Sequence, residues 1–205
     1  MTDQSVSRGK RDAILDAARA AFSRNGYERA SVEDIAAQAG IAKGTLYLYF
    51  KSKEELYLAA LTRDLRALAD RGRNEMERAA TLRGKMLAFL QVRLEYARSH
   101  EEFLRIYLAE YGSLFVKPGL QGELRRLARA NLRYVAKQVE EATAHGEIPP
   151  VPAGAVAMAL FAISRGLIEA RILGWKELQA RDDAAFAVDL LWRGIGRAAK
   201  GRRRS

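Results

Sequence analysis

Four side chains and a glycine between positions 43 and 49 have the chemistry to bind a nucleic acid. Lys43 can donate to a phosphate oxygen or to guanine acceptors, and Thr45 can offer a hydroxyl or touch a thymine methyl. The hydroxyls of Tyr47 and Tyr49 can donate to phosphate oxygens. Gly44 costs helix stability but lets the backbone approach a partner closely. Taken singly, each lysine can be a solvated charge and each tyrosine a packing residue, so the elements around them decide their role.

Two short helices joined by a tight turn are predicted around these residues. Leu46 and Phe50 lie at i and i+4, so they face a core while the polar set faces outward. The preceding helix opens at Ser31, where Ser-Val-Glu-Asp has the capping-box pattern, and ends at Gly40, which can adopt a left-handed conformation. Ile41 can pack between the two helices. This arrangement is typical of a helix-turn-helix, whose second helix enters the major groove of DNA.

A further helix is expected on each side of this pair. The first runs from about Lys10 to Arg24, with apolar residues at three-and-four spacing, and Gly26 ends it. The last starts at Ser52, which forms a second capping-box pattern with Glu55.

The rest of the chain predicts longer helices. Ala, Leu, Arg and Glu favour helix, and the four prolines, at 118, 149, 150 and 152, lie between helical patterns. We predict an all-α fold with an N-terminal three-helix helix-turn-helix DNA-binding domain over 1–53, a larger helical domain over 54–200 and a basic tail over 201–205. The helices of the larger domain are expected at about 82–99, 101–115, 120–144, 153–173 and 183–199.

The net charge of +10 favours a polyanionic partner, but its distribution makes it a weak argument for DNA binding. Residues 1–53 carry nine Lys/Arg against six Asp/Glu, a net charge of +3, whereas residues 193–204 carry six basic residues and no acid. Basic residues at both ends of the chain form either an arm that enters a minor groove or a disordered tail. These are Arg8, Lys10 and Arg11 before the first helix, and Arg202, Arg203 and Arg204 at the end.

Several other classes of protein are disfavoured by composition. The chain of 205 residues has no cysteine and only two histidines, so we expect no disulfide, no metal site and no cofactor. No nucleophile elbow or phosphate-binding loop is present, so a helical enzyme is an unsupported alternative. No apolar run approaches the roughly 18–20 residues of a membrane span, and the N-terminus lacks the apolar core of a signal peptide. We therefore expect a soluble, cytoplasmic protein without a membrane partner.

Residues 10–60 resemble the tetracycline-repressor (TetR) family of transcriptional regulators. The matching elements are ILDAARAAFSRNGYERASV, IAAQAG and KGTLYLYFKSKEEL, in the family's order and spacing. The resemblance implies that Ser31 and Lys53 touch phosphate and that Tyr49 reaches the DNA backbone. It also places four residues on or beside the groove, namely Lys43, Gly44, Thr45 and Tyr47. The sequence departs from the family at Ala42, where a capping serine is common, and alanine cannot accept an amide hydrogen bond.

The resemblance also implies that the helices at 153–173 and 183–199 pair across a twofold axis and form a homodimer. Their faces are rich in apolar and small residues, as at Val156, Leu160, Phe186 and Leu190. A dimer explains why both helices are so apolar, whereas burial inside the monomer is the alternative.

A small-molecule site between the middle helices is the third implication of the resemblance. Aromatic residues interleave there with polar ones, which is a common design for a binding pocket, although core packing is the ordinary role of each aromatic. The predicted ligand-binding residues are Phe89, Arg93, Tyr96, Phe103, Tyr107, Tyr111, Arg165 and Glu169. Arg165 and Glu169, at i and i+4, can equally form a plain surface pair.

The leading hypothesis is a DNA-binding transcriptional regulator, a repressor that a small-molecule effector releases from a palindromic operator in double-stranded DNA. The alternative is a DNA-binding protein of the same fold without a small-molecule inducer.

Overall fold

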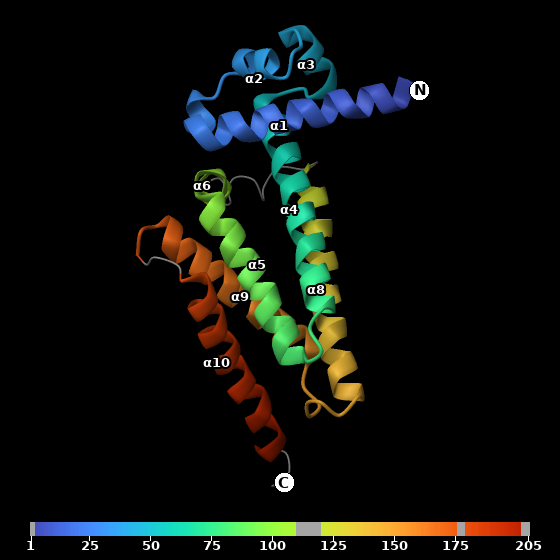
Figure 1. The fold of residues 1–205 in the computed structure, drawn as a ribbon, viewed down its shortest axis with the longest axis vertical. Coiled ribbons are helices and arrows are strands. Elements are labelled where there is room, and N and C mark those ends of the chain that lie inside the picture. The colour runs from blue at the N-terminus through green and yellow to red at the C-terminus, as the bar shows by residue number, and fades with distance from the viewer. Residues whose placement is uncertain (1–2, 110–119, 176–178, 202–205) are drawn as a thin grey trace. The chain divides into compact units, whose positions relative to one another are not determined.

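The computed structural model describes residues 3–109, 120–175 and 179–201, and within them it contains helices and no strand (Figure 1). The all-α prediction is therefore confirmed. The helices are α1 (Asp3–Arg29), α2 (Val32–Gln38), α3 (Lys43–Tyr49), α4 (Lys53–Glu77), α5 (Leu82–Ser99), α6 (Glu101–Ala109), α8 (Leu120–Ala144), α9 (Ala153–Ile172) and α10 (Ala180–Gly201). Residues 202–205 of the predicted basic tail lie outside the described part.

Most predicted helix bounds agree with the structure to within a few residues, and α1 differs the most. Residues 110–115 of the helix predicted at 101–115 lie outside the described part. It begins at Asp3 rather than near Lys10, so Lys10 and Arg11 are helical residues and not an arm that precedes the helix. Its far end extends to Arg29 through a kink at Gly26, which has a positive φ of 73°, accessible to glycine, and an extended ψ of 174° instead of the expected left-handed helix stop.

The chain forms two compact units that do not follow the predicted boundary after Lys53. The first comprises Met1–Arg66 and His100–Leu124, and the second comprises Ala67–Ser99 and Arg125–Ser205. The first half of α4 belongs to the first unit because the side chains of its Leu56–Leu61 segment are buried in that unit's core.

Apolar residues of α1 form the centre of the first unit. Ile14, Leu15 and Phe22 are buried there, as the helical spacing predicted. Tyr57 packs edge-on against Phe22 and against Phe103 of α6, with ring centroids 5.3 Å apart in each pair. Its hydroxyl donates to the Phe103 carbonyl at 3.1 Å, so this buried phenol has a polar partner.

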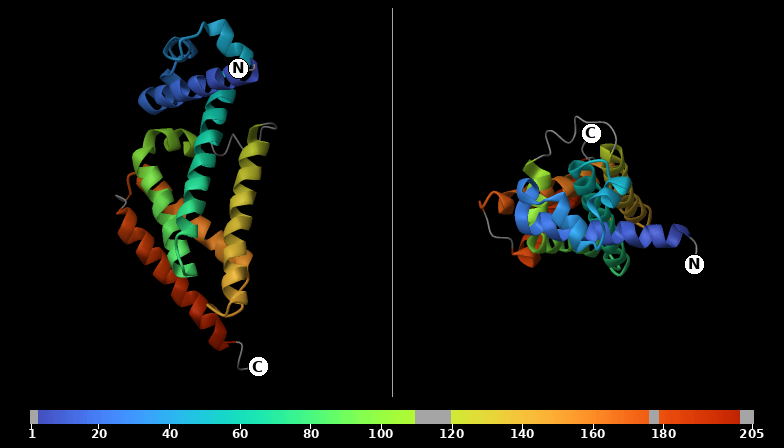
Figure 2. Two further views of the ribbon diagram at one scale, coloured as in Figure 1. Left: turned by 45° about the vertical axis from the view of Figure 1, so that its right-hand side comes forward. Right: turned by 90° about the horizontal axis from the view of Figure 1, so that it is seen from above.

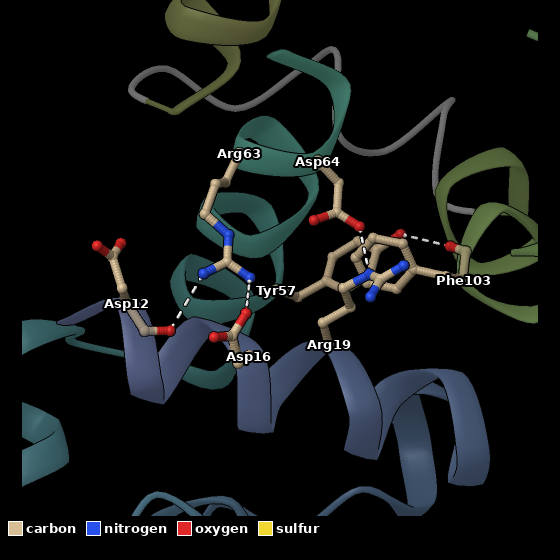
Figure 3. Close-up of polar contacts among 7 residues, drawn as sticks. All are labelled: Asp12, Asp16, Arg19, Tyr57, Arg63, Asp64 and Phe103. Carbon is tan, nitrogen blue, oxygen red and sulfur yellow. Dashed lines mark hydrogen bonds and ion pairs between the residues drawn. The ribbon is translucent and has the colours of Figure 1, made fainter. Parts of the chain in front are cut away.

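Ion pairs fasten α4 to α1 at the edge of this core (Figure 3). The Arg63 guanidinium donates to the Asp16 carboxylate at 2.6 Å and to the Asp12 carbonyl at 3.1 Å. Arg19 of α1 pairs in the opposite sense with Asp64 of α4 at 2.5 Å. Charges of both signs therefore alternate between the two helices, which favours one relative position of α1 and the first half of α4.

The second unit is built from α5, α9, α10, the second half of α4 and the greater part of α8. Helix α5 lies against both α9 and α10 (Figure 2), and its Leu90 and Leu94 are buried with Leu160 of α9 and Val188 of α10. On the α4 side, Arg73 donates to the Asn131 side chain of α8 at 3.1 Å.

Helix α9 corrects the expectation that no stretch is apolar enough to span a membrane. Its 20 residues pass that test by length and composition, and 22% of the tested window is buried inside the structure. A core helix of a soluble protein has the same composition. Ala157, Leu160 and Ser164 of α9 are buried within the unit, so part of its apolar surface already has a core role. Leu160 therefore fits the alternative of burial inside the monomer.

Candidate nucleic-acid interface

The turn between α2 and α3 has the geometry that the sequence predicted. Ser31 precedes α2 in an extended conformation, and its Oγ accepts from the Asp34 amide at 3.0 Å. Gly40 follows the end of α2 with a φ of 69°, and the Ile41 amide donates to the Ala36 carbonyl at 3.0 Å. Ile41 is half-buried against the core of the first unit. Figure 1 shows α2 and α3 side by side along α1.

Helix α3 separates an anchoring face from an exposed one. Leu46 and the following Phe50 are buried, whereas Lys43 and Gly44 are exposed and the side chain of Tyr47 is 42% exposed. A side chain at position 44 would meet open space, so the backbone there is accessible from outside. The exposed face is where a helix-turn-helix would meet DNA.

Three residues of α3 are placed differently from a simple outward set. Tyr49 is half-buried and packs against the core, and Thr45 is also half-buried. Leu48, which the sequence reading did not select, is 84% exposed. Its position two residues after the buried Leu46 puts it on the opposite side of the helix, and this spacing was the signal that could have found it.

The N-terminus of α3 lacks the side-chain cap that is common in the family. Ala42 is extended at the cap position and makes no side-chain hydrogen bond. Its carbonyl still accepts from the Thr45 and Leu46 amides at 2.9 and 3.2 Å. The first turn is therefore closed by the backbone alone, as the alanine predicted.

Lys53 lies at the start of α4 and reaches back to α1. Its Nζ donates to the Glu28 carbonyl at 3.0 Å and lies 4.7 Å from the centroid of the Tyr27 ring. The second capping box is also present, because the Glu55 amide donates to Ser52 Oγ at 3.0 Å and the Lys51 amide donates to the Glu55 carboxylate at 2.8 Å. The Lys53 ammonium is thus held against the C-terminal end of α1, close to the N-terminus of α4.

An ion pair that the sequence reading missed joins the two helices of the motif. Lys43 of α3 pairs with Glu33 in the first turn of α2, and both side chains are about half exposed. The hydrogen bond from Lys43 lowers the pKa of the Glu33 carboxyl, and the same bond raises the pKa of Lys43. The two residues lie ten positions apart on different helices, so helical periodicity does not predict the pair. Only the packing of α2 against α3 brings them together.

Another cation of the first unit lies beside the anchoring face of α3. The Arg11 guanidinium of α1 is 5.2 Å from the centroid of the Phe50 ring, which is within the range of a cation–π interaction. Arg11 is exposed otherwise.

The residues predicted for ligand binding fall into separate places. Phe89 and Arg93 of α5 meet Phe161 and Ser164 of α9 in the second unit. The centroids of the Phe89 and Phe161 rings are 4.8 Å apart. The Arg93 Cζ atom lies 5.3 Å from the Phe89 centroid and 5.1 Å from the Phe161 centroid. Arg93 Nε also donates to Ser164 Oγ at 2.6 Å. Tyr96 of α5 is half-buried.

Three other predicted ligand residues, Phe103, Arg165 and Glu169, make contacts of their own. Phe103 is buried in the core of the first unit against Tyr57. Arg165 is exposed and donates to the Glu169 carboxylate at 2.6 Å, which is the geometry of a surface pair within α9. Tyr111 and the side chain of Tyr107 lie outside the described residues. Among the residues that the structure describes, no group of three potential metal ligands comes together.

Comparison with known proteins identifies the family. Residues 14–60 match the family described as bacterial regulatory proteins, tetR family. An uncharacterised helix-turn-helix regulator of Bacillus subtilis, YhgD, is 28% identical over 147 residues, which is 71% of this chain and 75% of that protein. The regulator RutR of Escherichia coli is 30% identical over 144 residues, 69% of this chain and 66% of that protein.

The fold is shared over a longer stretch than the sequence. The regulator FadR of Bacillus subtilis, solved in complex with stearoyl-CoA, is 21% identical, with a TM-score of 0.71 over 87% of this chain and 96% of that one. The helix-turn-helix and these relatives define the class, a DNA-binding transcriptional regulator. The chain belongs to the TetR family.

Proposed function

We propose that the protein is a cytoplasmic repressor that binds a palindromic operator as a homodimer and leaves it when a small molecule binds the second unit. The observation that carries the proposal is the split character of α3. Its inner face is anchored by Leu46 and Phe50, and its outer face presents Lys43, Gly44 and Tyr47 on a short, exposed helix.

Base reading is assigned to the outer face of α3 and backbone binding to residues around it. Lys43, Thr45 and Tyr47 would contact base edges or lie beside them, and Gly44 would allow close approach. Ser31, Tyr49 and Lys53 would bind phosphates. Tyr49 fits this role because its half-buried ring is held in place, so its hydroxyl loses little freedom on binding.

The homodimer is assigned to α9 and α10. Large apolar side chains are exposed on both helices, with Met158 57%, Phe186 72% and Leu190 60% exposed. Phe186 and Leu190 are four residues apart and therefore share one face of α10, and an exposed apolar patch on a soluble protein marks an interaction surface. A second copy that packs the same two helices across a twofold axis would cover them, and it would place two reading helices on the two halves of a palindrome.

The effector site is assigned to the α5–α9 region around Phe89, Arg93 and Ser164. Arg93 offers a cation between two aromatic rings, a setting suited to a ligand with both polar and apolar parts. The structural relative FadR binds stearoyl-CoA, which supports the proposal that the effector of this protein is also a small molecule.

The proposal is tested by selecting the duplex that the purified protein enriches from a randomised DNA library. We expect an inverted repeat bound by one dimer, and we expect a metabolite extract to lower its affinity. Enrichment of no common sequence would overturn the assignment as a sequence-reading regulator. A bound repeat that no extract releases would remove the effector and leave the DNA-binding part of the proposal.

A further inference from the structure

The ion pair between Glu33 of α2 and Lys43 of α3 places a carboxylate beside a cation at the proposed DNA surface. Glu33 is outside the residues that the family resemblance assigned to DNA contact. We propose that Glu33 is a specificity-determining residue, which makes Lys43 favour a base edge over a phosphate. This inference rests on the proposed placement of α3 in the major groove.

The pair is weak enough for DNA to rearrange it. Both side chains are about half exposed, and exposed ion pairs contribute little to stability because water and salt screen them. Lys43 can therefore leave Glu33 for a DNA acceptor. Glu33 stays on α2 when this happens, because its backbone is part of the first turn of that helix.

A phosphate contact by Lys43 leaves Glu33 in an unfavourable position. Phosphate oxygens only accept hydrogen bonds and carry negative charge, so the exposed carboxylate would face a polyanion without its cation. The gain from the lysine–phosphate contact is thus offset by repulsion of Glu33. The Glu33 side chain is exposed, so burial in the protein does not shield its carboxylate from the phosphate.

A base edge accommodates both members of the pair. In the major groove, guanine offers the O6 and N7 acceptors to an ammonium, while the amino groups of cytosine and adenine donate to a carboxylate. Lys43 can donate to a base while Glu33 accepts from a neighbouring amino group or keeps its lysine. Glu33 is ionised at neutral pH with or without Lys43, whose hydrogen bond lowers the pKa of the carboxyl further.

The test compares two DNAs and two neighbouring carboxylates. The probes are the duplex enriched by the wild-type protein and a random duplex of equal length, with affinities measured by fluorescence anisotropy over a salt series. The variant is Glu33→Gln. The matched control is Asp34→Asn, which removes the same charge from the same helical turn, where the Asp34 amide donates to Ser31.

Glu33→Gln should raise affinity for random DNA about fivefold at 0.15 M salt and steepen the salt dependence by about 0.9, the effects of one added phosphate contact. Affinity for the enriched duplex should rise less, so the ratio of the two affinities falls. Asp34→Asn should change both affinities by a similar factor. In a Lys43→Gln background, Glu33→Gln should leave the ratio unchanged, because the lysine is no longer there to be redirected.

Two kinds of result separate the possible failures. An enriched-to-random ratio of one in the wild-type protein would overturn the placement of α3 and this inference with it. If the wild-type protein clearly prefers the enriched duplex, three results would overturn this inference alone. Glu33→Gln could leave the affinity ratio unchanged, or Asp34→Asn could reduce it as much as Glu33→Gln does. Glu33→Gln could also reduce the ratio in the Lys43→Gln background. Circular dichroism should show equal helical content in all variants, since neither carboxylate is in the core.

Discussion

Lys53 Nζ donates to the main-chain carbonyl of Glu28 at 3.0 Å, so the first residue of α4 is bound to the end of α1. The carbonyls at the end of a helix carry partial negative charge, which a lysine neutralises. An ammonium held in this way is also pre-positioned for a phosphate, because less side-chain freedom is lost when DNA binds.

Lys53→Ala should weaken binding to the enriched duplex and to random DNA by the same factor. A phosphate contact carries no sequence information, and its loss should reduce the salt slope by about 0.9. Titrations of both DNAs over a salt series measure this. A loss confined to the enriched duplex would contradict the assignment of Lys53 to the backbone.

Thr45→Ala and Tyr47→Ala should lower affinity for the enriched duplex more than for random DNA. Each specific contact removed should cost about 1–3 kcal/mol on the enriched sequence. The same anisotropy titrations measure the change, and circular dichroism controls for folding. If the ratio of affinities stays at its wild-type value in both variants, α3 does not read bases through these residues.

Ala42→Ser should stabilise the first unit by about 0.5–1 kcal/mol. Position 42 has the extended conformation of an N-cap and lacks a side-chain acceptor, which serine would supply to an amide of the first turn of α3. Urea unfolding followed by circular dichroism measures the gain. Ala37→Ser, on the exposed side of α2, is the control and should be neutral or slightly destabilising. An equal response of the two variants would contradict a capping effect.

Phe186→Asp and Leu190→Asp should convert the protein to a monomer without unfolding it. Both side chains are exposed in the single chain, so a carboxylate there is costly only when a partner buries it. Sedimentation at micromolar concentration measures the change. Leu160→Asp is the contrasting variant, because Leu160 is buried in the monomer and its replacement should unfold the second unit. A wild-type protein that sediments as a monomer would contradict the proposed interface.

The periodicity of the sequence predicted local structure well. The bounds of α3 and the inward direction of Leu46 and Phe50 follow from the 3.6-residue repeat and from flanking turn residues, which act over a few positions. The contacts that depend on tertiary structure were not accessible in this way. The spacing of Phe89 and Phe103 gives no sign that they belong to different compact units.

The same limit applies to helices that are apolar on more than one side. Sequence alone could not divide α9 between a side that packs inside the second unit, as at Leu160, and a side that remains exposed, as at Met158. The periodic pattern gives the amount of apolar surface, and only the packing of α5 and α10 against α9 shows which part is covered.

Three side chains of α4 bind main-chain carbonyls. Lys53, Tyr57 and Arg63 donate to the carbonyl oxygens of Glu28, Phe103 and Asp12. A carbonyl is present whatever residue occupies the position, so each of these bonds can survive a change of the acceptor residue that leaves the backbone in place. Related proteins are therefore free to vary at positions 12, 28 and 103, within the limits set by packing, while the donors on α4 are not. Among related proteins, we therefore expect substitutions at these contacts to occur more often at the acceptor positions of α1 and α6 than at the donor positions of α4.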